Sequence, residues 1–370
     1  MDQSSPIRGR RLPRFCIVFL AIAAVCVLLS ILFRLSEPFS DGFNRVVSQP
    51  LRVLFAWITY PLPFSLAEAL LLLSPLMLVL LIRHAVLHYC HSWRAVGIYL
   101  VCLVSVASLF FSSFVLLFSA GYHGATLDSE GKLNLAREDV STEELYTTAR
   151  HLAERVSEEA QNVVFIHEDF SVMPYTKGEM NQKLMSAYDK VSEEYDFLPH
   201  FKSRVKPVLL SVPMSYTHIT GVYSYFTGEA NLNVDFPDYT LPFTAAHELA
   251  HQRGVARENE ANFVAYLVCI SSDDPYIRYS GYLSMYEYVA SALYGADHDL
   301  YYEARALLSL PVRYEQWAYS LFFDRYRDSV ASEVTGTVND TYLKLQGTEG
   351  TRSYGLVVDL AVAYDKKIYP

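Results

Sequence analysis

Long apolar segments near the N-terminus constrain this chain more than any other feature. Residues 15–33 and 95–121 carry no charged side chain, and each is long enough to cross a bilayer as a helix. Residues 69–82 form a shorter apolar run between Glu68 and Arg83, with Pro75 inside. Extended back to Leu62 this run can also span, with Glu68 near an interface; a buried amphipathic segment is the alternative. The sequence therefore predicts three transmembrane helices, at about 15–33, 62–82 and 95–121.

Basic residues predict how these helices are oriented. Arg8, Arg10, Arg11 and Arg14 precede the first run, so residues 1–14 are expected to be a cytoplasmic tail. The run is long and no small-x-small cleavage site follows it, so it does not look like a removed signal peptide. Three crossings then place a loop of residues 34–66 and all of residues 122–370 outside the membrane.

Charge and cysteine usage exclude some classes of function. The formal net charge is −10 among 370 residues, which argues against nucleic acid as a partner. Residues 122–370 contain one cysteine, Cys269, so they cannot form an internal disulfide. Cys269 lies in an apolar helical run, and we expect it to pack in the core.

The segment 244–254 contains the sequence His-Glu-Leu-Ala-His. Residues four apart lie on one face of a helix, so His247 and His251 present two imidazoles to the same point. That arrangement supplies two ligands of a tetrahedral Zn²⁺ site, and Glu248 lies where a carboxylate reaches a metal-bound water. Gly254 suits the end of this helix. The alternative is a surface helix with two incidental histidines.

A second predicted helix begins shortly after Gly254. A short turn would make the two helices antiparallel and bring Glu258, in the first turn of the second helix, back toward His251. Two histidines and a glutamate are a known ligand set of catalytic zinc, so Glu258 is a reasonable third ligand. Glu260 is the second choice. Asn262 lies four residues after Glu258 and could orient a ligand histidine.

Residues 122–370 are expected to fold as an α+β, mostly helical domain with a small antiparallel sheet. Helices are expected at 141–160, where Ser141 and Glu144 form a capping-box pattern, and at 180–196. A β-rich run at 205–212 precedes a hairpin of residues 219–226 and 229–234. The remainder reads as helix: a Tyr-rich segment at 276–294, a helix start at 297–299, residues 312–345, and a last helix at 353–364.

The order HELAH followed by Glu-x-x-Ala-Asn resembles the gluzincin pattern, HExxH plus a later ExxAD or ExxSD, found in membrane-embedded zinc peptidases. This resemblance implies that Glu258 is the third ligand and that Asn262 occupies the usual position of an Asp. The short distance between His251 and Glu258 is closer to the metzincin pattern HExxHxxGxxH. Gly254 matches the glycine of that pattern, but Arg257 replaces its third histidine and cannot bind a metal.

The whole chain is similar to a family of bacterial membrane proteins of unknown function that is grouped with the zinc peptidases. The matching segments are residues 63–66, 228–234, 247–252, 258–262 and 353–355. The resemblance implies a zincin-like peptidase in the bacterial cytoplasmic membrane. It also implies Tyr354 as the donor that stabilises the transition state, with His298, Tyr279 and Tyr282 as rivals.

These observations predict a membrane-anchored, zinc-dependent peptidase whose site lies outside the cytoplasmic membrane. Its expected partners are the lipid bilayer and a peptide or protein substrate. His247, His251 and Glu258 would bind zinc, and Glu248 would act as the general base. Two alternatives remain open. The domain could be a non-catalytic zinc-binding sensor or scaffold, which would not need Glu248, or the hydrolysed bond could belong to cell-wall peptide.

Overall fold

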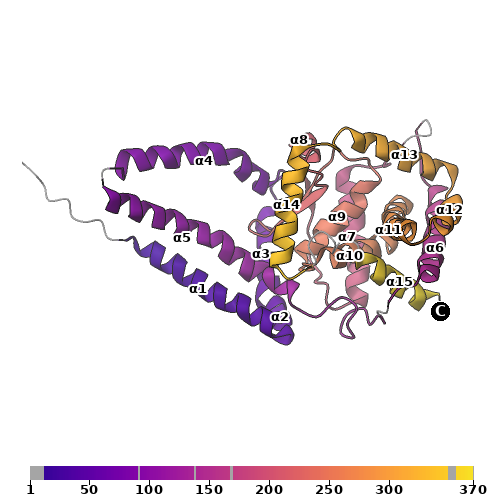
Figure 1. Ribbon diagram of the computed structural model, residues 1–370, viewed down its shortest axis with the longest axis horizontal. Coiled ribbons are helices and arrows are strands. Elements are labelled where there is room, and N and C mark those ends of the chain that lie inside the picture. The colour runs from indigo at the N-terminus through magenta and orange to yellow at the C-terminus, as the bar shows by residue number, and fades with distance from the viewer. Residues whose placement is uncertain (1–11, 91, 137–138, 167–169, 349–355, 370) are drawn as a thin grey trace, which may run out of the picture.

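The computed structural model describes residues 12–90, 92–136, 139–166, 170–348 and 356–369. Three long helices project from one side of a globular, mostly helical part (Figure 1): α1 (Arg14–Leu35), α4 (Leu66–His88) and α5 (Trp93–Leu117). Each is long and apolar enough to cross a membrane, which confirms the three predicted apolar helices and indicates a membrane protein. α1 packs along α5, whereas α4 stands apart from both over most of its length (Figure 1).

The segment between α1 and α4 is helical rather than an extended loop. It contains α2 (Glu37–Phe43), the π-helix η1 (Asn44–Ser48) and α3 (Gln49–Thr59). Arg52 of α3 is 2% exposed, and its guanidinium donates to Asn44 Oδ1 at 2.9 Å and to the Leu117 carbonyl at 2.6 Å. A buried guanidinium needs such partners, so these bonds hold α3 against the end of α5.

The globular part is built around α11, which packs against α6, α9, α10 and α15. α6 begins with the predicted capping box of Ser141 and Glu144, and α10 buries Cys269 as expected. The predicted helix at 312–345 is divided into α13 and α14. The helices are α6 (Thr142–Ala160), α7 (Lys177–Glu194), α8 (Ser211–Ser215), α9 (Thr240–Gln252), α10 (Glu258–Ile270), α11 (Pro275–Ala296), α12 (His298–Ala306), α13 (Leu310–Asp324), α14 (Val330–Leu345) and α15 (Val357–Ile368), with a 3₁₀ turn, η2, at Ser119–Tyr122.

A three-stranded sheet lies beside α9. The predicted hairpin is present as β2 (Gly221–Ser224) and β3 (Glu229–Leu232), joined through Gly228 at φ +71°. The prediction of an antiparallel sheet is wrong, because β1 (Val205–Pro207) pairs with β3 in parallel and the strand order is β1-β3-β2. The physical reason is that residues after β1 turn into α8 and cross over before β2, so the predicted strand at 205–212 ends early.

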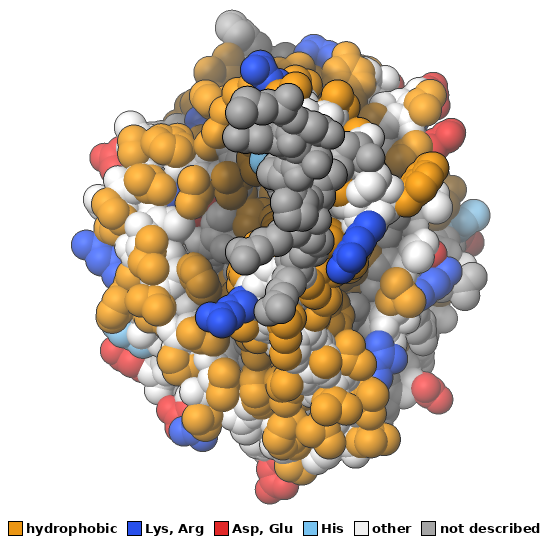
Figure 2. Space-filling model, turned by 90° about the vertical axis from the view of Figure 1, so that its left-hand side faces the viewer, with side chains coloured by type: hydrophobic (Ala, Val, Ile, Leu, Met, Phe, Trp, Pro, Cys, Tyr) orange, Lys and Arg blue, Asp and Glu red, His pale blue; other side chains and the backbone are white. Residues whose placement is uncertain are grey.

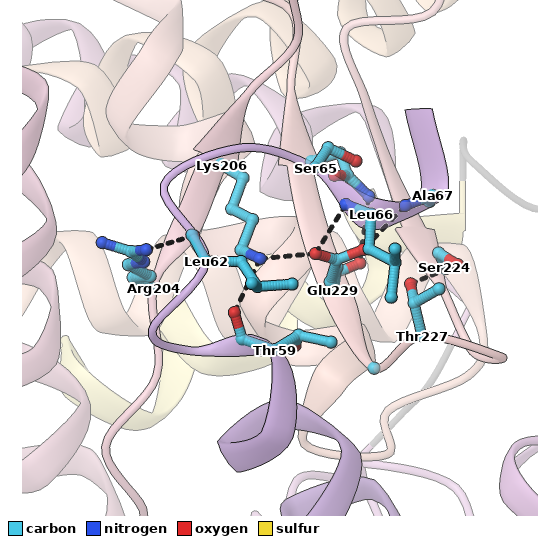
Figure 3. A network of polar contacts seen from close by, with 12 residues as sticks. Thr59, Leu62, Ser65, Leu66, Ala67, Arg204, Lys206, Ser224, Thr227 and Glu229 are labelled. Carbon is cyan, nitrogen blue, oxygen red and sulfur yellow. Dashed lines mark hydrogen bonds and ion pairs between the residues drawn. The ribbon is translucent and has the colours of Figure 1, made fainter. Parts of the chain in front are cut away.

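A buried polar network attaches α4 to this sheet (Figure 3). The Lys206 ammonium of β1 pairs with the Glu229 carboxylate of β3 at 2.5 Å and donates to the Thr59 carbonyl at 2.8 Å. Both Glu229 oxygens also accept the first N–H groups of α4, from Leu66 at 3.0 Å and Ala67 at 2.9 Å. These N–H groups have no partner inside the helix, so a carboxylate at this position stabilises its start. We call Lys206, Glu229 and their partners the α4 anchor.

Candidate metal centre

The two histidines of the HExxH segment lie in α9, which is buried along almost its whole length. Ala245, Ala246 and Ala250 favour the helix and allow close packing. The helix ends before Gly254, whose φ of +98° favours glycine, and a Cβ there would overlap the Arg52 guanidinium. Gly254 therefore ends the helix, as predicted, and lets the chain turn back toward α10.

The structure brings His247, His251 and Glu258 together. The Nε2 atoms of the two histidines are 3.0 Å apart, and Glu258 Oε2 lies 3.2 Å from His247 Nε2 and 3.4 Å from His251 Nε2. Their candidate ligand atoms all lie within 4.8 Å of one another. Glu258 is the first residue of α10, so the predicted return of the second helix produces this meeting of side chains.

The three donors suit a zinc ion. Ligands at about 2.0–2.1 Å from a tetrahedral ion are separated by about 3.3 Å, which matches the 3.0–3.4 Å distances among the three donor atoms. His251 Nδ1 lies 2.7 Å from the Val255 carbonyl, so Nδ1 carries a proton and Nε2 is the ring atom left to bind a metal. Once the Nε2 protons are released, two nitrogen lone pairs and a carboxylate offer a cation three ligand atoms.

The charges of these groups are coupled. Burial alone would lower the pKa of His251, but the Glu258 carboxylate outweighs it and raises that pKa to about 9. Burial also works to raise the pKa of Glu258, but the two imidazoles outweigh burial and hold that pKa well below its ordinary value. Glu258 is therefore ionised over the neutral range, as a metal ligand has to be.

Glu248 lies beside the three donors but is not one of them. The Tyr223 backbone N–H of β2 donates to its carboxylate, while Glu248 Oε2 is buried and has no partner among the described residues. Gly221 permits this approach of β2, because a Cβ there would lie 2.6 Å from Glu248 Oε1. Burial raises the pKa of Glu248 to about 7. A carboxylate held at one oxygen and unpartnered at the other is suited to accept a proton.

The structure separates the two candidate glutamates of α10. The Glu260 carboxylate accepts the Leu127 N–H and the Arg257 guanidinium, each at 2.9 Å, and so points away from the histidines. Asn262 lies in the cavity wall and interacts with Tyr288. No hydrogen bond joins it to a histidine, and both Asn262 Nδ2 and His247 Nδ1 are without partners among the described residues.

The donors open into a cavity of about 1000 Å³. Its walls come from β2, α9, α10, α11, α13 and α14, together with the end of α5. Tyr288 of α11 and Tyr342 of α14 line the cavity, and Glu258 contributes to raising the pKa of each hydroxyl, although burial contributes more. These two tyrosines are candidate hydrogen-bond donors that sequence reasoning missed, because nothing in their spacing distinguishes them among 28 tyrosines.

Of the donors proposed from the sequence, the three that the structure describes do not line the cavity. Tyr354 lies outside the described residues. His298 is exposed at the start of α12 and stacks on Tyr294 at 4.2 Å. Tyr279 is buried against Glu315, and Tyr282 faces Tyr266 on another side of α11. None of these three lines the cavity, because α11 turns the side chain of Tyr288 toward the metal centre instead.

The candidate centre lies next to the end of a membrane-spanning helix. The ring of Phe118, the residue after α5, packs edge-on against the His251 ring at 5.8 Å. Phe118 belongs to a small buried cluster with Tyr122, Tyr223, Ala256 and Leu343. Figure 1 shows α14 on the side of the globular part from which the long helices project, with α9 and α10 between it and α11 in this view. Figure 2 views the molecule from the same side and shows many hydrophobic side chains there. The cavity is therefore close to the expected membrane boundary.

Comparison with known proteins gives one match. A family model described as "Protein of unknown function (DUF3810)" matches residues 39–362, which include the whole candidate metal centre. No curated protein and no solved structure matches the chain.

Proposed function

Because the chain belongs to the DUF3810 family, whose description states no activity, we propose its function from the candidate metal centre itself. The protein is a membrane-anchored, zinc-dependent peptidase of the zincin type that hydrolyses peptide bonds outside the cytoplasmic membrane. The observation that carries this proposal is the meeting of His247, His251 and Glu258 at 3.0–3.4 Å beside an unpartnered oxygen of Glu248. A structural zinc site would be closed by a fourth protein ligand, whereas this group of three faces a cavity.

Each residue of the candidate metal centre has its own role in the proposed reaction. His247, His251 and Glu258 would hold zinc, which when bound supplies Lewis acidity toward a water and a carbonyl oxygen. Glu248 accepts a proton from the attacking water at its free oxygen and passes it to the leaving amine. The hydroxyls of Tyr288 and Tyr342 are placed to donate to the developing oxyanion.

The ligand assignment is tested by a matched pair of substitutions. Glu258→Gln should lower zinc content, measured on the purified full-length protein, by at least about tenfold, since a lost ligand costs more than a lost outer contact. Glu260→Gln is the control. It removes the same charge two residues away, and it should weaken the contacts to Leu127 and Arg257 while zinc content stays unchanged. The assignment fails if Glu260→Gln loses the metal and Glu258→Gln keeps it.

The orientation in the membrane follows from the arginines before α1. We propose that the N-terminus is cytoplasmic and that the globular part, from about residue 122, lies outside. Fusions of alkaline phosphatase and of a fluorescent protein at residue 125 report the two compartments. We expect phosphatase activity and no fluorescence there. Fluorescence without phosphatase activity would place the candidate metal centre in the cytoplasm.

A further inference from the structure

The cavity contains one charged group that the metal chemistry does not use. Four residues of α11 line it, at the spacing of one helix face: Ser284, Glu287, Tyr288 and Ser291. Tyr288 is next to the metal centre through its contact with Asn262. Glu287 instead lies toward the start of α9 and toward α13, where its carboxylate accepts a hydrogen bond from Gln316. We call the part of the cavity beside Glu287, Tyr239 and Tyr319 the Glu287 compartment.

No lysine or arginine side chain of the described cavity wall faces this carboxylate. Among the described residues that line the cavity there is no lysine or arginine, and two of its three histidines belong to the metal centre. The third, His218, is bonded through Nε2 to the Tyr326 carbonyl. Burial raises the pKa of Glu287 to about 7, with Glu315 acting in the same direction. Glu287 is half-buried, so its carboxylate is partly desolvated without a counter-ion, and an entering cation would reduce that cost.

The walls around Glu287 are aromatic and carry hydroxyl groups. Tyr239, Phe243 and Tyr319 line the cavity here, and the rings of Tyr239 and Tyr319 meet edge-on at 6.0 Å. The Tyr239 hydroxyl is buried without a partner among the described residues. Aromatic faces attract a cation, and a free hydroxyl can accept one of its N–H groups. The compartment therefore offers an ammonium or guanidinium group a carboxylate, a hydroxyl and ring faces together.

The compartment is within reach of a bound peptide. Tyr239 and Thr240 precede His247 by about two helical turns, which is roughly 10 Å along α9. An extended peptide advances about 3.3 Å per residue. A long side chain one or two residues from the cleaved bond would thus extend into the compartment around Glu287.

We propose that Glu287 is a specificity-determining residue and that the compartment around it binds a lysine or arginine side chain of the substrate. This inference rests on the proposed peptidase function and names its substrate class: peptides with a cationic residue within about two positions of the cleaved bond. The remaining cavity acids, Glu248 and Glu258, are committed to the metal centre, so Glu287 alone sets this preference.

Matched peptide pairs test the proposal on the full-length protein in detergent. Each pair is identical except for lysine or glutamine at one of the two positions on either side of the centre. At one or more positions we expect the wild type to cleave the lysine peptide at least about tenfold more efficiently. Glu287→Gln should remove this preference without loss of zinc. Glu303→Gln, which removes an exposed charge from α12 outside the cavity, should leave it unchanged.

A second variant protects the test against a folding failure at Glu287. Ser291 is exposed and lies four residues after Glu287 on the same face of α11. In Ser291→Lys the new ammonium can pair with Glu287 from within the helix and occupy the compartment. The preference for lysine peptides should again fall by about tenfold. An unchanged preference in both Glu287→Gln and Ser291→Lys, or equal cleavage of every peptide pair by the wild type, would overturn the proposal.

Binding separates this inference from the peptidase proposal. If no peptide is cleaved, the affinity of zinc-loaded Glu248→Gln for each peptide pair is measured by fluorescence anisotropy. Tighter binding of a lysine peptide that disappears on adding Glu287→Gln would support the cationic compartment while hydrolysis fails. Equal binding of lysine and glutamine peptides would refute the compartment whatever the outcome for hydrolysis.

Discussion

Replacement of Glu229 by Gln is expected to lower the free energy of unfolding by about 3–5 kcal/mol, the usual cost of breaking a buried ion pair by removing one partner. The Lys206 and Glu229 side chains are 4% and 0% exposed. With Gln at position 229 the ammonium would lose its counter-ion and keep only neutral acceptors such as the Thr59 carbonyl, so its charge would stay buried without compensation. A single amide oxygen is also a weaker acceptor than a carboxylate for the first N–H groups of α4.

The effect can be measured as the melting temperature of the full-length protein in detergent. At about 2–4 °C per kcal/mol for a domain of this size, the change corresponds to roughly 6–20 °C. Lys206→Met/Glu229→Gln is the control, because it removes the stranded charge and should recover a large part of the loss. A melting temperature for Glu229→Gln within about 2 °C of the wild type would show that the α4 anchor contributes little to stability.

The α4 anchor also connects the membrane helices to the candidate metal centre. Glu229 belongs to β3, and the carbonyl of the preceding Gly228 accepts a hydrogen bond from Gln252 at 2.7 Å. Gln252 directly follows His251 in α9. On the other side of the centre, Phe118 packs on the His251 ring at the end of α5. The histidines are thus linked to α4 through β3 and to α5 through Phe118. Both of these helices are long and apolar enough to cross a membrane.

Local patterns made much of this arrangement predictable. The four-residue spacing of His247 and His251 fixes a common helix face, and the Gly254 turn sends α10 back across it. Apolar length predicts α1, α4 and α5 because a bilayer sets the length of a spanning helix. The capping box of Ser141 and Glu144 and the hairpin around Gly228 are equally local signals.

Features that depend on contacts between distant segments could not be predicted in this way. The parallel pairing of β1 with β3 joins Val205 to Ala230, and no local pattern specifies such a partner. A lysine in a strand is usually exposed, and only the pairing with the Glu229 carboxylate explains why Lys206 is buried. α14 is mostly exposed, yet several of its residues line the cavity. This position depends on contacts with distant segments, so the sequence did not predict Tyr342 as a cavity residue.

The local sequence does not decide between Glu258 and Glu260 as the third ligand. Both carboxylates lie in the first turn of α10, and both could reach a metal as far as the sequence shows. The structure separates them because Arg257 and the Leu127 N–H engage Glu260. Leu127 lies between η2 and α6, outside any helix or strand, and its side chain is 1% exposed in the core.

The catalytic proposal depends most on Glu248. Gln at this position has nearly the same shape and can still accept the Tyr223 N–H, so α9 and the three metal donors should remain in place. It cannot take a proton from the attacking water. Since general-base catalysis contributes about 10²–10⁴-fold, peptide turnover should fall by that factor. His247→Ala, by contrast, should lose zinc and activity together because it removes a ligand.

Turnover of a cleavable peptide by wild type and Glu248→Gln, compared at equal zinc content, tests the central claim most directly. We expect equal metal content and melting temperature, a rate about 10²–10⁴-fold lower for Glu248→Gln, and no rescue of a deletion strain by that variant. A sensor or scaffold would need the metal centre but not the base. If Glu248→Gln cleaves at the wild-type rate, or fully restores the deletion phenotype with zinc bound, the protein is not the hydrolase proposed here.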